Sequence, residues 1–235
     1  MKLVISETVL ELFPQTTLGV VRLHHGDNAG DSPEIVELLR QAESALPEKF
    51  GGKSVIDHPH IAVWREAYRR FGARPKDAPS SVENLARRVL GGTALRHVNN
   101  LVSLYNAVSL RYLLPVGGED LDKVSGDVLL TRAGNDELPV CLLGEQEARP
   151  PHPGEVIYKD AEGTLCRRWN WKEADRTKLT RETKNAFLVI ETLPPVPFDV
   201  LRRAVEDLAD LVRRHGGGEV STAFLDGEHP EVDLL

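Results

Sequence analysis

Cysteine, long apolar runs and familiar catalytic signatures are scarce or missing in this sequence of 235 residues. Its two cysteines, Cys141 and Cys166, lack CxxC spacing and are too few for a structural zinc site or a disulfide framework. No apolar stretch approaches the roughly 20 residues that cross a bilayer, so we expect no membrane-spanning segment. The N-terminal stretch has no small-residue cleavage site, so we expect no secretion signal and a cytoplasmic protein.

Motifs for metal and nucleophilic chemistry are also missing. His58 and His60 have no third ligand at a diagnostic spacing, so we expect no metal site, and we expect no cofactor. There is no GxSxG elbow, and Gly117-Gly118 is not followed by the GK[ST] of a phosphate-binding loop.

The overall composition is that of an ordinary globular chain. Hydrophobic residues make up 41% and charged residues 28%, and the net charge is −7. A chain of this length buries roughly 70% of its unfolded surface without staples. Because the Pro- and Gly-rich interruptions are only loop-sized, we expect one domain spanning residues 1–235.

The hydrophobic period changes near residue 115, from helical spacing to strand alternation. We therefore predict an α+β fold, a mixed β sheet flanked by helices. Ser32 before Pro33 is a helix start, and Ser80 with Glu83 forms a capping box. The predicted helices are 7–13, 33–46, 59–71, 81–90, 98–113 and 198–215; the predicted strands are 2–5, 18–25, 127–132, 138–143, 155–159, 164–169, 185–192 and 219–225, with a loosely held tail after them.

Basic residues and two of the three tryptophans gather in Leu165–Thr183, in a chain that is acidic overall. If this stretch is a strand, Trp169 and Trp171 point to the same face and form a platform for a base, while the basic side chains meet phosphates. An exposed sheet edge with tryptophans packed on the core is an equally good interpretation from the residues alone. The residues predicted to bind nucleic acid are Arg167, Arg168, Trp169, Asn170, Trp171 and Lys172.

The series GGxxLxxxNNLVSLYNAVSL, LPVGGEDLDKVSGDV, LLGEQE, PHPGEVIYKD and LCRRWNWKE resembles the B3/B4 domain of the phenylalanyl-tRNA synthetase β subunit, above all its free-standing versions. The resemblance covers about Pro59–Thr192, so residues 1–58 and 193–235 are extensions that complete the same domain. It implies a central β sheet with flanking helices, an amino-acid pocket and a nearby tRNA end. In the synthetase this domain edits, hydrolysing tyrosine wrongly esterified to tRNA.

The resemblance also implies site residues. Asn106 stands at the Asn of the family's V-T-N run, and Pro115 and Asp120 stand at the Pro and Asp of its P-L-H-A-F-D run, whose His falls on Gly117. We therefore predict Asn106 and Asp120 as catalytic. The residues predicted to bind substrate are Gly117, Gly118, Asp122, Glu145, Thr180 and Thr183. Without the family, the acids are equally interpretable as self-capping loops or exposed turns, and Asn99, Asn100, Asn106 and His97 as hydrogen-bonded helix residues.

Two functions of different class follow. One is an RNA-binding, trans-acting deacylase that hydrolyses the ester of mischarged aminoacyl-tRNA, with the acceptor end of tRNA and an amino-acid moiety as partners. The other is a non-catalytic module that binds tRNA or an amino acid. A hydrolase of another small ester or amide is a weaker alternative. We expect no DNA partner.

Overall fold

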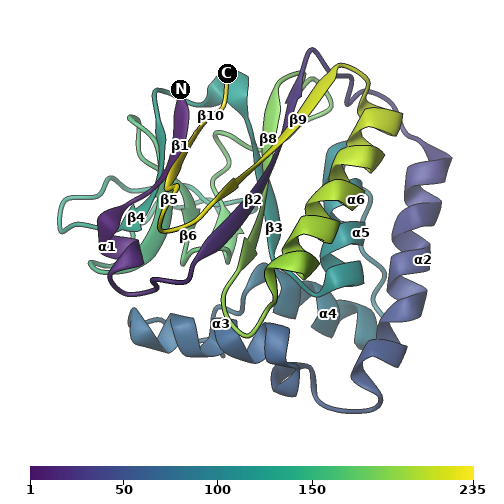
Figure 1. Cartoon of the computed structure of the whole chain (residues 1–235), viewed down its shortest axis with the longest axis horizontal. Coiled ribbons are helices and arrows are strands. Elements are labelled where there is room, and N and C mark those ends of the chain that lie inside the picture. The colour runs from purple at the N-terminus through teal and green to yellow at the C-terminus, as the bar shows by residue number, and fades with distance from the viewer.

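A computed structural model describes all residues, 1–235, and contains two β sheets with helices on one side and at one end (Figure 1). The α+β expectation is confirmed, with two sheets in place of one. The first sheet has the order β10-β1-β4-β5-β6-β7, and the second has the order β3-β8-β2-β9. The first is mixed, because β1 pairs parallel with β4 and its other neighbours pair antiparallel.

Both chain ends contribute strands to the sheets. The six-stranded sheet consists of β10 (Glu231–Asp233), β1 (Lys2–Ile5), β4 (Val128–Arg132), β5 (Val156–Lys159), β6 (Thr164–Arg167) and β7 (Lys172–Glu173). The four-stranded sheet consists of β3 (Val116–Asp120), β8 (Ala186–Thr192), β2 (Thr17–His24) and β9 (Glu219–Leu225). The segments 1–58 and 193–235 thus supply strands to the same two sheets as the middle of the chain.

Strand β8 is buried along its whole length, as expected from its adjacent apolar residues, because its two faces meet different layers. Leu188 and Ile190 pack with helices α5 (Asn100–Tyr112) and α6 (Phe198–Gly216), whereas Phe187 and Val189 belong to the core shared with the other sheet. Helix α2 (Pro33–Phe50) packs outside α5 (Figure 1). Gly19 in β2 permits the close approach of α6, since a Cβ there would lie 2.2 Å from Val205 Cγ2.

Three further helices are α1 (Glu7–Leu10), α3 (Pro59–Arg70) and α4 (Ser81–Leu90). The predicted caps form: Ser32 Oγ accepts from Ile35 N, and Ser80 Oγ accepts from Glu83 N. Glu83 does not complete the capping box; its buried carboxylate pairs instead with Arg65 and Arg87, each at 2.7 Å. Two carboxylate–guanidinium pairs satisfy that carboxylate better than one backbone amide would.

Four predictions of elements are wrong. Residues 138–143 form only isolated bridges, and Pro47 lies within the last turns of α2, which ends at Gly51 in the left-handed conformation. Helix α5 begins at Asn100, because Asn99 caps it by accepting from Val102 N. The tail is held, since β10 pairs with β1. The sequence pattern does not predict β3 or β7 as strands.

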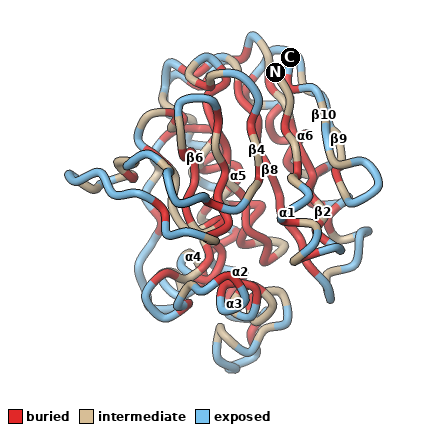
Figure 2. The backbone as a smooth tube through the Cα atoms, turned by 90° about the vertical axis from the view of Figure 1, so that its left-hand side faces the viewer, coloured by how far each residue is buried: buried red, intermediate tan, exposed pale blue.

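Figure 2 shows β8 and most of α5 as buried segments in the middle of the molecule. One hydrophobic cluster fills the space between the sheets and reaches α3 and α4, and a second lies between the four-stranded sheet and α5 and α6. None of the helices is long and apolar enough to cross a membrane. The polar cavity described below opens in the first cluster, where the two sheets diverge.

Candidate functional site

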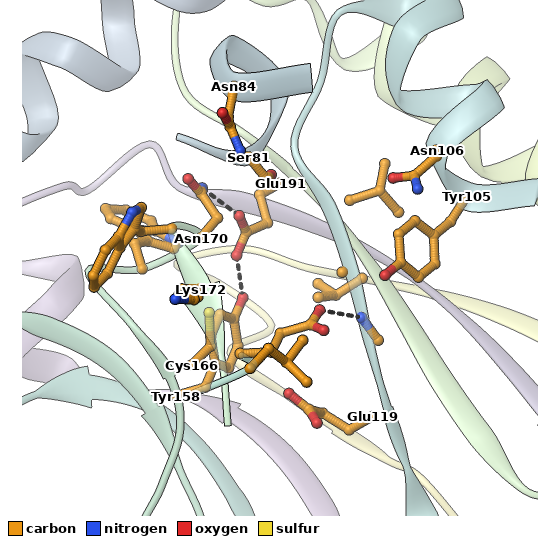
Figure 3. Close-up of a pocket in the computed structure, with 18 of the residues that line it drawn as sticks. Ser81, Asn84, Tyr105, Asn106, Glu119, Tyr158, Cys166, Asn170, Lys172 and Glu191 are labelled. Atoms are coloured by element: carbon orange, nitrogen blue, oxygen red, sulfur yellow. Dashed lines mark hydrogen bonds between the residues drawn. The ribbon is translucent and has the colours of Figure 1, made fainter. Parts of the chain in front are cut away.

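A cavity of about 180 Å³ lies between the two sheets (Figure 3). Strands β3 and β8 form one wall, β5, β6 and β7 form the other, and the start of α4 and the middle of α5 close it. Its lining residues are Ser81, Asn84, Leu85, Tyr105, Asn106, Val116, Gly117, Gly118, Glu119, Leu143, Tyr158, Cys166, Trp169, Asn170, Trp171, Lys172, Glu173, Phe187, Val189 and Glu191.

Three glutamates from three strands line this cavity: Glu119, Glu173 and Glu191. Strand alternation places Glu191 on the same face of β8 as Phe187 and Val189, and that face looks toward the six-stranded sheet. The sequence alone predicts no role for any of the three. A signal existed for Glu191, because it is a charged residue inside the apolar run NAFLVIET.

Glu191 is almost completely buried and well hydrogen-bonded. Tyr158 Oη donates to Glu191 Oε1, and Asn170 Nδ2 donates to Glu191 Oε2, each at 2.5 Å. Tyr68 Oη in turn donates to Asn170 Oδ1 at 2.8 Å and fixes that amide. Burial raises the pKa of Glu191 to about 7, even though these hydrogen bonds favour the charged form.

Glu173 stands beside the two glycines of β3. Its Oε1 accepts a hydrogen bond from Gly118 N at 3.3 Å, and a Cβ on Gly117 would lie 2.9 Å from the same oxygen. The lack of a side chain at Gly117 therefore leaves room for the Glu173 carboxylate. Burial raises the pKa of Glu173 to about 7. A carboxylate with a pKa near neutrality is suited to exchange protons with a substrate.

Glu119 is the least satisfied of the three. It is 5% exposed, and its Oε2 has no hydrogen-bond partner. Burial, followed by the neighbouring Glu173 charge, raises the pKa of Glu119 well above its ordinary value. No salt bridge reaches Glu119, Glu173 or Glu191. A buried carboxylate without a counter-ion is costly, so these three concentrate unfavourable electrostatics in one small volume.

The other ionisable groups that line the cavity are either neutral because they are buried or paired with an opposite charge. Burial raises the pKa values of Tyr105, Tyr158 and Cys166 well above their ordinary values. The Cys166 thiol is therefore a poor nucleophile, since nucleophilic attack needs the thiolate. Lys172 is the one lysine of the lining, and its Nζ pairs with Glu145 Oε1 at 2.8 Å. No cluster of histidine, cysteine, aspartate or glutamate has a geometry that would hold a metal ion.

The cavity brings together residues from all three predicted groups. Asn106, predicted as catalytic, lines it with Gly117 and Gly118, predicted to bind substrate. Part of the predicted nucleic-acid-binding group lines it as well, namely Trp169, Asn170, Trp171 and Lys172. Glu145 stays outside the lining and reaches it only through its pair with Lys172.

Asp120 and the threonines lie elsewhere and brace a loop. Asp120 accepts from Thr183 Oγ1 at 2.7 Å and pairs with Lys123 Nζ at 3.1 Å, while Thr183 Oγ1 accepts from Thr180 N. The Asp122 carboxylate accepts from Asn185 Nδ2. Their polar groups are engaged with one another, and none lines the cavity. The structure therefore places Asp120, Asp122, Thr180 and Thr183 in a hydrogen-bonded loop region, apart from the cavity that Asn106 lines.

The predicted tryptophan platform does not form. Arg168 and Trp169 have φ values of 49° and 65°, so the chain turns after β6 instead of continuing as a strand to residue 169. Trp169 is completely buried against Phe13 and Trp64 and is not available to stack on a base. Trp171 is partly exposed, with the Arg168 guanidinium 4.3 Å from its ring centroid. Trp171 and Arg168 are what remains of the platform.

Most basic side chains of the same stretch are already paired with acids. Arg167 is buried and forms two hydrogen bonds with Glu155, at 2.9 and 2.8 Å, so it cannot hold a phosphate. The other pairs are Lys172–Glu145, Arg176–Asp160, Lys178–Asp175 and Arg181–Asp31, all at or below 2.8 Å. The predicted basic patch is therefore smaller than the sequence indicates.

These features define an α+β domain with a carboxylate-rich polar cavity between its two sheets. The sequence matches the family described as the B3/4 domain over residues 63–217, more than half of the chain, and the chain belongs to that family. This confirms the resemblance seen in the motifs. No protein with a curated function matches the sequence.

One solved structure with a similar fold is an N-terminal fragment of the phenylalanyl-tRNA synthetase β-subunit from Pyrococcus horikoshii. The sequence identity is 11% and the TM-score is 0.48. The match covers 93% of this chain and 49% of the fragment, so the chain spans about half of the fragment's length.

Proposed function

We propose that the protein is a trans-acting aminoacyl-tRNA deacylase and that the cavity between the sheets holds the aminoacyl group. The observation that carries the proposal is the placement of Glu173, whose pKa is about 7, in one small cavity with Asn106 and the Gly117-Gly118 backbone. Family membership supports a context related to tRNA synthetases. The enzyme would act in the cytoplasm, where aminoacyl-tRNA is used.

The size of the cavity supports an amino-acid side chain as its occupant. A cavity of roughly 150 Å³ holds a benzene molecule, so about 180 Å³ suits one side chain and excludes a nucleoside. The terminal adenosine would then stay outside. Trp171, which lines the cavity, and Arg168, whose guanidinium lies over its ring, would meet the base and phosphate of that adenosine.

Glu173 is our candidate for the general base. Its carboxylate would take a proton from a water molecule as the water oxygen attacks the ester carbonyl carbon. The Asn106 amide would donate to the oxyanion of the tetrahedral intermediate. When the bond from the carbonyl carbon to the ribose oxygen breaks, protonated Glu173 would return the proton to that oxygen, releasing a free amino acid and deacylated tRNA.

The position of Gly117 connects this proposal with the family. In the motif the resemblance places a histidine there, and in this chain the Glu173 carboxylate fills the space next to the missing side chain. We infer that Glu173 supplies, from β7, the proton-transferring group that the sequence lacks at position 117. This departure from the motif gives no reason to expect tyrosine as the substrate.

A non-catalytic module that binds an amino acid is the second candidate. It is favoured by the pairing of the basic residues with acids, which leaves few charges for the phosphates of tRNA. Incubating the protein, in excess, with a panel of labelled aminoacyl-tRNAs separates the two. The deacylase shortens the ester half-life of at least one member, and unchanged half-lives across the panel would overturn the proposal.

A further inference from the structure

The carboxylates of the cavity outnumber the positive charges that a simple aminoacyl group brings. An aminoacyl ester carries one cation, its α-ammonium group. With a neutral side chain bound, that single charge would face Glu119, Glu173 and Glu191, none of which has a salt bridge within the protein. At least one of the three would then have to stay protonated, because a buried carboxylate without a counter-ion is costly.

Glu119 is the group that most lacks a partner. It is nine-tenths or more buried, its Oε2 accepts no hydrogen bond, and its carboxylate lines the cavity (Figure 3). Arg176, the basic group whose charge acts on Glu119, is engaged elsewhere: it pairs with Asp160 at 2.7 Å and donates to the Lys123 carbonyl at 2.9 Å. No salt bridge within the protein reaches Glu119, so in the free protein burial keeps this carboxyl group largely protonated, and a cationic group of the ligand would be the partner that lets it ionise.

The rest of the lining suits an organic cation. Tyr105, Tyr158, Trp169, Trp171 and Phe187 place aromatic rings around the carboxylates. Aromatic faces attract ammonium and guanidinium groups, and desolvation strengthens that attraction. The metal alternative is poor, because these acids do not form a group with the geometry to hold a metal ion.

We propose that the cavity selects an amino acid whose side chain ends in an ammonium or guanidinium group, with Glu119 as the main partner of that group. This inference rests on the proposed function only in taking an aminoacyl group as the occupant. Glu191 would bind the α-ammonium group, and Glu173 would activate the water molecule.

Binding of such a cation is coupled to the release of protons. In the free protein Glu173 and Glu191 have pKa values of about 7, so part of the cluster is protonated at neutral pH. A bound cation stabilises the ionised form, so affinity rises as the pH rises through about 7. The groups that face the cluster are Tyr105 from α5, Tyr158 from β5, Cys166 from β6 and Lys172 from β7, with Arg176, Asp160 and Thr177 behind Glu119.

Matched ligands test the selection in the wild-type protein. The probes are 3′-amino-3′-deoxyadenosine acylated through an amide with lysine or with norleucine, and a second pair with arginine or citrulline. Each pair differs mainly in the side-chain charge, and none of the amides carries the scissile ester. By calorimetry we expect the cationic member to bind roughly 10- to 100-fold tighter at about pH 8, with a smaller ratio at about pH 6 and protons released on binding.

The variant Glu119→Gln should reduce the lysine-to-norleucine ratio by about tenfold or more, because the amide has no charge to offer. The exposed residue Glu48 of α2 supplies the control, and Glu48→Gln should leave the ratio unchanged. If Glu119→Gln does not fold, the two ligand pairs on the wild-type protein carry the test. Equal affinities within both pairs, or no binding of any probe, overturn the inference.

The same experiments distinguish a failure of this inference from a failure of the proposed deacylase function. Tight, charge-selective binding without hydrolysis of lysyl- or arginyl-tRNA would support the inference and contradict the proposed deacylase activity. Hydrolysis confined to aminoacyl-tRNAs with neutral side chains, such as tyrosyl-tRNA, keeps the deacylase and overturns the inference.

Discussion

Two regions of this protein treat charge in opposite ways. In the stretch 167–184 nearly every basic side chain has an acidic partner, and the buried Arg167–Glu155 pair has the most complete hydrogen bonding. In the adjacent cavity three glutamates have no basic partner. Charges that hold a fold together are paired, whereas unpaired charges in a small cavity reduce stability and have their use with a ligand. Under the proposed function the chemistry lies in the carboxylates, although the basic stretch is more conspicuous in the sequence.

The largest effect expected from this contrast is on the rate of hydrolysis. Glu173→Gln should lower the rate constant for ester hydrolysis by about 10²- to 10⁴-fold, because glutamine cannot accept the proton of the attacking water. Single-turnover measurements with the best aminoacyl-tRNA of the panel give that constant directly. Glu48→Gln is the matched control on an exposed surface. A Glu173→Gln protein with wild-type rates would remove Glu173 from the mechanism.

Substitutions in the paired stretch 167–184 should change the stability of the protein and not its rate of hydrolysis. Arg167→Ala leaves Glu155 buried and uncompensated, and we expect the free energy of unfolding to fall by about 3–5 kcal/mol. Arg181→Ala breaks an exposed pair with Asp31 and should cost no more than about 1 kcal/mol. Urea unfolding of both variants gives the comparison. Similar values for the two would show that the burial of the Arg167 pair does not matter.

The stability of the ligand-free protein should depend on pH through the cavity. The folded-state pKa values of Glu173 and Glu191 are raised from 4.5 to about 7, so the folded state binds more protons than the unfolded state between those values. The contribution is fully present below about pH 4.5 and is lost as the pH rises through about 7.

Glu191→Gln should therefore gain stability relative to wild type as the pH rises from about 5 to about 8. The gain is at most a few kcal/mol, since one pKa unit corresponds to about 1.4 kcal/mol. Thermal or urea unfolding across that range measures it, and Glu48→Gln should show no such trend. A difference that is flat with pH would mean that Glu191 titrates normally in the folded protein.

The smallest effect is expected on the salt dependence of tRNA binding. Because most basic groups are paired, tRNA binding should involve only about two phosphates, and the slope of log K against log salt should be about −1.4 for a single-stranded end. Arg168→Ala should reduce the slope, and Lys178→Ala, whose ammonium group is already paired with Asp175, should not. A slope steeper than about −4 would mean that a larger basic surface binds the RNA.

The sequence predicted the elements with a strong local signal. The run NAFLVIET indicated a central strand, and Ser80 indicated the start of α4, since apolar period and capping are local properties. The edge strands β7 and β10 have two and three residues and depend on pairing with distant partners, so no local pattern reveals them. Strand β3 was hidden by its glycines, which indicate a loop by propensity.

The site was predicted in part, for the same physical reasons. Asn106, Gly117 and Gly118 were found through the family motif and do line the cavity. Whether a charged residue is paired depends on contacts such as Arg167–Glu155 and on the turn at Arg168 and Trp169, which only the tertiary structure determines. Glu119, Glu173 and Glu191 come from three strands, and nothing in their local sequence shows that they converge.

The account depends most directly on the ionisation of these three glutamates. Titration of the side-chain carboxyl groups of the ligand-free protein by carbon-13 NMR, with Glu119→Gln, Glu173→Gln and Glu191→Gln for assignment, measures it. We predict two glutamates with pKa values of about 7 and a third well above the ordinary value. A spectrum in which every glutamate titrates near its ordinary value of 4.5 would contradict the account.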